Sequence, residues 1–421
     1  MLRSLFLIPV SIILSSQFTL AMIEISAGNP LVIDVLLIDR GLFQGGDRDR
    51  LLSADPSITV RGIPMPGHFS IAYLGRDAHY MNRGMRLYMP RSYQKMKEIG
   101  DTILLAEAAC GSTSFHDVYF DAKWMVWFIK AVQEDGVPLS MWGGDASWGG
   151  GGAGDYKSWG DTVLDEILPF QSIGGYSPDL AAFHYPHFLD PEHELARLPW
   201  KSAGPVELLN TVRSKPGSTL VAEAIIDTTR YPWIAWWESG KGKVVGETQV
   251  FGSMGTSNRM AEEWKFYQDF VIYMIYFSVG KPIPNDVERA HRIREEINTH
   301  IYKASLLISL LEFVEKFGAS TVELYEELGK INQMELLAEE YIRMDDYDSA
   351  SDIFDEIHQA WMALNTQAIK VKDRALFWVY LIEWFIVTSS GIIAGTILYS
   401  IMVKRRLYRD TPTTRMTRLG I

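Results

Sequence analysis

An aspartate occupies a position whose surroundings are typical of a catalytic nucleophile. The segment Pro138–Gly149 begins with apolar residues and runs into a glycine-rich turn, where Asp145 directly follows Gly143 and Gly144. A strand followed by such a turn exposes its tip residue at the carboxyl end of a sheet. Asp145 or the nearby Ser147 could act there as a nucleophile or base with a histidine partner. The structural alternative is an aspartate whose carboxylate accepts hydrogen bonds from backbone N–H groups of the turn.

A second candidate for nucleophilic chemistry is Cys110, the single cysteine of the chain. It follows a predicted strand and precedes His116, so an activated thiol is one interpretation and a small buried residue is the other. One cysteine permits neither an intramolecular disulfide nor a cysteine-based metal site. His116, His184 and His187 are the histidines that could partner Asp145, and the sequence leaves their positions in space open.

Metal-ligating residue types are concentrated in one later segment, which contains His184, His187, Asp190 and His193. Imidazole and carboxylate groups are ligands for zinc and calcium. Prolines at positions 186 and 191 imply a loop, however, so the spacing of these residues fixes no common ligand face. We therefore expect a surface loop, with no metal site and no cofactor.

The same glycine-rich turn is the best candidate for ligand binding. Open α/β sheets bind ligands in the crevice at the carboxyl ends of their strands. We expect Gly143, Gly144, Asp145 and Trp148 to contribute to this crevice. Trp148 could stack against a sugar ring, or it could pack in the core. The glycines that follow lack the Lys-Ser/Thr pair of a phosphate-binding loop.

Two apolar segments predict export and membrane anchoring. Residues 1–21 combine an early arginine, a short apolar stretch and a terminal Ala21, a pattern typical of a signal peptide. An uncleaved anchor helix is the alternative. Ala375–Val403 is long and apolar enough to cross a bilayer, so lipid is the expected partner of this segment. Aromatic residues cluster near its start, as in an interfacial belt, at Trp378, Tyr380 and Trp384.

Charge sets the predicted orientation and excludes one class of partner. The tail, residues 404–421, holds six basic residues and one acidic residue, which predicts a cytoplasmic tail and an extracellular N-terminal domain. The whole chain nevertheless has a formal net charge of −12, so the exported part is strongly acidic and nucleic acid is not expected as a partner. Glu383, inside the apolar segment, is expected to reach the outer interface or, alternatively, to contact a partner helix.

The remaining sequence divides into an α/β region and a helical region. Buried strands are predicted at 30–39, 57–61, 101–106 and 138–142, with helices between them, a further helix at 159–168 and a hairpin at 233–249. This alternation predicts a mostly parallel sheet flanked by helices, whereas residues 62–90 show no clear period and are expected to be irregular. Residues 285–374 contain no proline and repeat apolar residues at helical spacing, which predicts a helical stalk or small bundle. The predicted divisions are 22–284 for the α/β domain, 285–374 for the stalk and 375–403 for the span.

Three segments together resemble the glutamine amidotransferase-like family, a branch with the class I glutamine amidotransferase-like (flavodoxin-like) fold. They are Leu36–Asp39, Leu139–Trp148 and Gly240–Glu247, taken in this order along the chain. The resemblance covers roughly residues 30–280 and implies a fold in which a Cys-His-Glu set performs glutaminase chemistry. This chain has Asp145 in place of the elbow cysteine, and no His-x-Glu follows the last predicted strand.

The missing thiol favours binding over catalysis. We expect a membrane-anchored, non-catalytic domain for ligand binding or partner scaffolding at the cell surface, with protein partners or a second copy held through the stalk. One alternative is a divergent envelope hydrolase that uses Asp145 with a histidine. Another is a structural subunit of a membrane complex.

Overall fold

The structure is a computed structural model of the 421-residue chain. It describes residues 32–39, 48–64, 78–107, 111–112, 118–144, 147–148, 156–177, 185–204, 206, 208–226, 228–249 and 259–409. The candidates Asp145, Cys110, His116 and His184 lie outside these residues.

An eight-stranded sheet forms the centre of the α/β region, in the order β2-β1-β3-β6-β13-β12-β11-β9. Its first five strands are parallel, and the last three pair antiparallel. The bounds of the parallel strands are β1 Ile33–Asp39, β2 Ile58–Pro64, β3 Thr102–Ala106, β6 Leu139–Trp142 and β13 Gly242–Glu247. The others are β9 Tyr185–Phe188, β11 Thr219–Ile226 and β12 Thr229–Ser239. The predicted fold class, a mostly parallel sheet flanked by helices, is confirmed.

Both faces of the sheet are buried at β1, as its continuous apolar run requires. Val35 and Leu37 point into one core cluster with α7 (Tyr267–Val279), and Leu36 and Ile38 point into a second cluster with α5 (Ala122–Gln133). The alternation follows from the two-residue period of a strand. The sheet is therefore held from both sides, which fixes the positions of its strand ends.

Two local predictions were wrong. Residues 62–90 are not simply irregular, because β2 continues to Pro64 and α3 spans Ala78–Tyr88. The helix expected at 159–168 is a pair of short 3₁₀ helices, η2 Trp159–Asp161 and η3 Val163–Ile167. Ser158 caps the first of these and Thr162 caps the second, so the side chains that start each helix also interrupt a longer one.

The predicted hairpin is formed by β12 and β13. Its turn contains Gly240, which has a φ of +63° and lies against α5. A Cβ atom there would come within 2.5 Å of the Gln133 Cα and carbonyl oxygen. Glycine is therefore required both for the left-handed backbone and for the close approach.

The remaining described elements of the α/β region are short. They are α1 Arg48–Ser53, α4 Tyr93–Lys97, β4 Gly111–Ser112, β5 Val118–Tyr119, β7 Tyr156–Lys157, β8 Phe170–Tyr176, η4 Glu194–Arg197, η5 Trp200–Ser202, β10 Asn210–Ser214 and α6 Arg259–Glu263. β10 pairs with β8, and β4 pairs with β5 and β7, in small antiparallel sheets.

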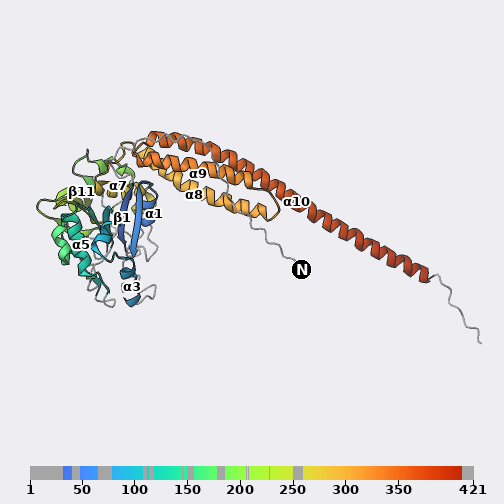
Figure 1. The fold of residues 1–421 in the computed structure, drawn as a ribbon, viewed down its shortest axis with the longest axis horizontal. Coiled ribbons are helices and arrows are strands. Elements are labelled where there is room, and N and C mark those ends of the chain that lie inside the picture. The colour runs from blue at the N-terminus through green and yellow to red at the C-terminus, as the bar shows by residue number, and fades with distance from the viewer. Residues whose placement is uncertain are drawn as a thin grey trace, which may run out of the picture. The chain divides into compact units, whose positions relative to one another are not determined.

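The predicted stalk consists of α8 Val287–Glu315, α9 Val322–Arg343 and the first part of α10 Tyr347–Arg409. Gly280, in the left-handed conformation, ends α7, and Asp286 caps the start of α8, so the predicted boundary after residue 284 lies between these helices. The three helices pack around a common apolar core that includes Leu311, Leu328 and Phe354. Figure 1 shows them running side by side, with α10 continuing beyond the other two.

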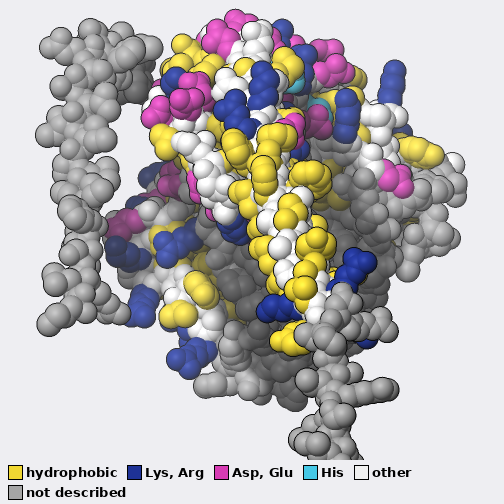
Figure 2. Space-filling model, turned by 90° about the vertical axis from the view of Figure 1, so that its right-hand side faces the viewer, with side chains coloured by type: hydrophobic (Ala, Val, Ile, Leu, Met, Phe, Trp, Pro, Cys, Tyr) yellow, Lys and Arg dark blue, Asp and Glu magenta, His cyan; other side chains and the backbone are white. Residues whose placement is uncertain are grey.

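The far part of α10 is the predicted membrane segment. It contains a window with a mean hydropathy of 1.8, none of which is buried, and it is long enough to cross a bilayer. Figure 2 looks along this helix from its far end and shows hydrophobic side chains gathered on it. The prediction of a helix able to span a membrane is confirmed, and it is continuous with the stalk.

Candidate functional site

The candidate site lies where four neighbouring parallel strands end. β1 ends at Asp39, β3 is followed by Glu107, β6 by Gly143, and β13 ends at Glu247. Because β1, β3, β6 and β13 are adjacent and parallel, their carboxyl ends meet at one edge of the sheet. This is the edge at which open α/β sheets bind ligands.

Arg48, at the start of α1, pairs with acids from two of these strand ends. Its guanidinium lies 2.7 Å from the Asp39 carboxylate and 3.1 Å from that of Glu107, and all three side chains are buried. Burial disfavours the charge on Arg48, but the Asp39 and Glu107 carboxylates outweigh it and raise the pKa of the guanidinium. The arginine thus ties β1 and β3 together through charge.

The backbone at Glu107 has a φ of +48°, in the left-handed region that non-glycine residues rarely adopt. Gly144 comes very close to it: a Cβ atom on Gly144 would lie 2.5 Å from the Glu107 Cα. The turn after β6 and the turn after β3 are therefore packed backbone against backbone. This contact gives a structural reason for glycine at position 144.

Glu247 is an acid at this edge whose pKa departs from its ordinary value. Its carboxylate accepts hydrogen bonds from the Trp233 indole and the Gln249 amide, both at 2.7 Å, and from the Gly143 amide at 3.3 Å. Burial raises the pKa of Glu247 to about 8, against the opposing effect of these donors and of Arg48. The side chain is therefore largely protonated at neutral pH.

The two backbone N–H groups of the Gly-Gly turn donate hydrogen bonds to side chains inside the protein. The Gly143 N–H donates to Glu247, and the Gly144 N–H donates to the Asn210 side-chain oxygen at 3.0 Å. Asn210 also donates from its amide nitrogen to the Gly144 carbonyl at 2.9 Å. An oxyanion hole needs amide N–H groups that point at the reacting oxygen. These two amides are already occupied by side chains beneath the turn.

The other two candidate residues of the turn that the structure describes, Ser147 and Trp148, are buried in the protein interior. Ser147 is 1% exposed and Trp148 is fully buried. The Trp148 indole donates to the Glu247 carbonyl at 2.7 Å, and its ring stacks edge-on against Phe170 at 5.2 Å. In this arrangement the indole serves packing, and its assignment as a ligand contact stays a prediction. Asp145, next to these residues in sequence, lies outside the described part of the chain.

The described members of the histidine-rich segment, His187, Asp190 and His193, each have a separate local structural role. The surface loop expected in this segment is wrong for residues 185–188, because His187 lies on the edge strand β9, which pairs with β11. The Asp190 carboxylate accepts from the Glu192 amide at 2.9 Å, and His193 Nδ1 accepts from the Leu195 amide and caps η4. Burial lowers the pKa of His193. Within the described residues, no group of three or more His, Cys, Asp or Glu side chains is placed to hold a metal ion.

A second buried charged cluster was missed from the sequence. Arg294 of α8 pairs with Asp55, which follows α1, and with Asp269 of α7, and all three side chains are at most 1% exposed. An aspartate inside the apolar, aromatic run of α7 is the signal that could have found it, because a buried acid requires a partner. We refer to Arg294, Asp55 and Asp269 as the junction cluster.

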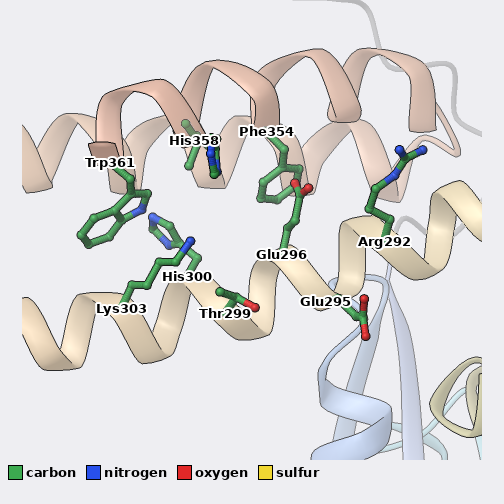
Figure 3. Close-up of a pocket in the computed structure, with 10 residues that line it drawn as sticks. Arg292, Glu295, Glu296, Thr299, His300, Lys303, Phe354, His358 and Trp361 are labelled. Carbon is green, nitrogen blue, oxygen red and sulfur yellow. The ribbon is translucent and has the colours of Figure 1, made fainter. Parts of the chain in front are cut away.

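A groove of about 310 Å³ lies between α8 and α10 in the stalk. In Figure 3, Lys303, His300 and Trp361 gather at one end of it, and Arg292 and Glu296 lie toward the other. His300 Nδ1 is 2.7 Å from a Glu335 oxygen of α9. Because the lining carries charges of both signs, electrostatics favour no single class of ligand here.

No protein-family model matches the chain, and no curated protein matches it in sequence. Among solved structures, cytoplasmic protein STM3548 from Salmonella typhimurium is 17% identical over 58% of this chain and 99% of its own, with a TM-score of 0.43. Cytoplasmic protein STM1381 from Salmonella typhimurium LT2 is 19% identical over 58% and 98%, also with a TM-score of 0.43. Exo-beta-1,4-mannosidase Op5Man5 from Opitutaceae bacterium strain TAV5 is 10% identical over 59% and 36%, with a TM-score of 0.29. None of these scores is high enough to establish function.

Proposed function

We propose that this chain is a single-pass membrane scaffold whose amidotransferase-like domain binds partners and performs no glutaminase chemistry. In this proposal residues 1–21 direct export, residues 375–403 cross the bilayer and the basic tail, residues 404–421, lies in the cytoplasm. The observation that carries the proposal is the junction cluster, whose ion pairs join the stalk to the α/β domain.

The junction cluster joins elements that are far apart in sequence. Arg294 Nε and Nη2 each lie 2.8 Å from an Asp55 oxygen, while Nη1 reaches Asp269. The Tyr276 hydroxyl donates to Asp55 at 2.9 Å, and His291 Nδ1 lies 2.6 Å from Asp269. Burial opposes ionisation of Asp55, but the Arg294 guanidinium outweighs it and lowers the pKa of the carboxyl group. The charges are thus satisfied only when α8 is docked on the domain.

A second set of contacts holds the other stalk helices at the same place. Arg343, at the end of α9, donates to the Pro56 carbonyl at 3.1 Å. Lys281 lies 3.1 Å from Asp345, in the turn between α9 and α10. The first of these contacts adjoins the junction cluster, because Pro56 directly follows Asp55. A scaffold requires such a connection, because movement of the domain on its stalk would not hold a partner at a fixed distance from the membrane.

The Gly-Gly turn supports the absence of glutaminase chemistry. Its Gly143 and Gly144 amides are engaged by Glu247 and Asn210, so they are not offered to a tetrahedral intermediate. Position 145 carries a carboxylate where the resembling family has its thiol. The carboxylate at position 145 removes the nucleophile that acyl transfer from glutamine would need.

Native mass spectrometry of the full-length protein, extracted from its own membranes in mild detergent, tests the proposal. We expect a complex of fixed stoichiometry that is heavier than the 47.7 kDa chain. A lone chain that releases ammonia from glutamine would contradict the proposal. A lone chain whose turnover of another amide or glycoside is lost in Asp145→Asn would instead select the divergent hydrolase.

A further inference from the structure

We propose that the turn between α8 and α9 is a second membrane contact, with its apolar side chains seated in the headgroup layer beside α10. We refer to Phe313, Phe317, Val322 and Tyr325 as the hairpin tip. The proposal rests on the proposed function in one respect, namely that α10 crosses a bilayer. It adds that the stalk touches the same bilayer at a separate point.

The hairpin tip exposes apolar surface that the stalk core does not use. Phe313 is 43% exposed, Phe317 42%, Val322 62% and Tyr325 37%. The rings of Phe313 and Phe317 pack edge-on against each other at 5.0 Å, so they form one patch. In the same part of α8, Leu311 and Val314 are fully buried against the bundle. The tip therefore faces away from the core, and exposure of its apolar surface to water is unfavourable.

Contacts along the stalk show which part of α10 lies level with the tip. Arg289 pairs with Asp348, and His300 stacks against Trp361 at a ring distance of 5.0 Å. These pairs show that α8 and α10 run in the same direction, with partners about 60 positions apart in sequence. The end of α8 at Glu315 is accordingly level with the residue after Ala375. Ala375 is 6% exposed, and the described residues of α10 beyond it are partly or fully exposed.

This level is where the apolar segment of α10 begins. At a rise of about 1.5 Å per residue, a hydrocarbon core roughly 30 Å thick takes up about 20 of the residues 375–403, and the rest of the segment lies in the two interfaces. The start of the segment, with Trp378 and Tyr380, then falls in the outer interface, where aromatic side chains are favoured. The hairpin tip lies at the same depth as these aromatic side chains. Its own aromatic and aliphatic groups suit that layer.

The charges near the tip specify the kind of lipid surface. Glu312, Glu315 and Glu323 are exposed around it, together with Lys316. An acidic surround disfavours an anionic leaflet. The expected occupant is therefore a zwitterionic headgroup layer, held through apolar insertion rather than through charge.

Depth measurements with spin labels test this. The full-length protein carrying Cys110→Ser is reconstituted into phosphatidylcholine vesicles with one cysteine at a time: Phe317→Cys and Val322→Cys at the tip, Met362→Cys higher on the stalk, and Ile393→Cys in the span. Met362 is 56% exposed and lies roughly 20 Å from the level of Ala375 at the helical rise, so it is the matched aqueous control. Each cysteine carries a nitroxide, and collision with oxygen is compared with collision with a water-soluble nickel chelate.

The proposal expects labels at 317 and 322 to shift toward oxygen by several-fold relative to 362, while the label at 393 is shielded from nickel. Tip labels as accessible to nickel as the label at 362, with 393 still shielded, would overturn the membrane contact and leave the anchor intact. Dipolar broadening between tip labels, without lipid exposure, would overturn it in favour of a second copy. A label at 393 that is open to nickel would refute the membrane anchor itself. If Cys110→Ser does not fold, a photo-crosslinking residue at 317 in the natural background gives the same decision, because lipid adducts are expected and their absence contradicts the proposal.

Discussion

Two buried charged clusters, one where the parallel strands end and one where the stalk meets the α/β domain, differ in how their charges are balanced. At the sheet edge, Arg48 pairs with Asp39 and Glu107, and burial raises the pKa of the neighbouring Glu247 to about 8. In the junction cluster, Arg294 lies between Asp55 and Asp269, and tyrosine and histidine side chains complete the contacts. The first cluster is sensitive to pH, whereas the second depends on a helix being docked.

The comparison indicates that similar residue types serve different purposes in the two places. The sheet-edge acids lie where parallel strands end, the position that most α/β proteins use for ligands. The junction acids lie between the domain and its stalk, in the segment after α1 and on α7. A buried arginine with two carboxylates is therefore no evidence of catalysis in itself, and its location decides what it does.

The largest effect is expected from breaking the junction cluster. Arg294→Met leaves Asp55 and Asp269 buried without their cation, which should lower the free energy of unfolding by about 3–5 kcal/mol. The matched control is Arg289→Met on the same helix, whose partners Asp286 and Asp348 are largely exposed. That change should cost at most about 1 kcal/mol. Thermal unfolding of the full chain in detergent measures both, and equal losses would contradict the structural role of Arg294.

A smaller effect is expected from adding one methyl group at the sheet edge. Gly144→Ala places a Cβ 2.5 Å from the Glu107 Cα, so backbone must move, at a cost of about 1–3 kcal/mol. Gly329 of α9 is the control, because a Cβ there meets nothing within 4 Å. Gly329→Ala should stabilise the helix by about 1 kcal/mol. If Gly144→Ala raises the free energy of unfolding in urea, as Gly329→Ala is expected to, the close packing of the two turns is contradicted.

A further effect expected at the sheet edge is a pH dependence of stability. The pKa of Glu247 is about 8 in the folded chain and 4.5 as the ordinary value, so the folded state binds the proton more tightly. This contribution to stability is complete below pH 4.5 and is lost as the pH rises toward 8. Glu247→Gln should therefore flatten the fall in melting temperature between pH 5 and pH 8. An unchanged slope in the variant would show that other groups cause it.

The sequence predicted those elements whose signals are local. The apolar run of β1, the glycines of the β12–β13 turn and the helical spacing of α8 to α10 each fix their own conformation. The α3 helix was missed because it is short, polar on average and contains Gly84, although its apolar residues do recur at helical spacing. Arg294 was missed for another reason: Asp55 lies far from it along the chain, and only tertiary packing brings the two together.

The candidate site was predicted in position but not in detail. Gly143 and Gly144 do lie at the carboxyl edge of the sheet, as the strand-and-turn pattern indicated. Their engagement by Glu247 and Asn210 could not be read from the turn itself, because those partners come from distant strands. Trp148 likewise lies in the turn by sequence, yet its packing partner Phe170 is on β8.

Hydrogen exchange measured by mass spectrometry tests the central claim, that stalk and domain form one rigid scaffold. In the full-length protein in detergent, we expect peptides from α7 and from the first half of α8 to open together, with the same free energy. Arg294→Met should lower the protection of both to the same extent, while Arg289→Met leaves both unchanged. If the start of α8 exchanges much faster than α7 in the unmodified chain, the domain moves freely on its stalk and the scaffold proposal is contradicted.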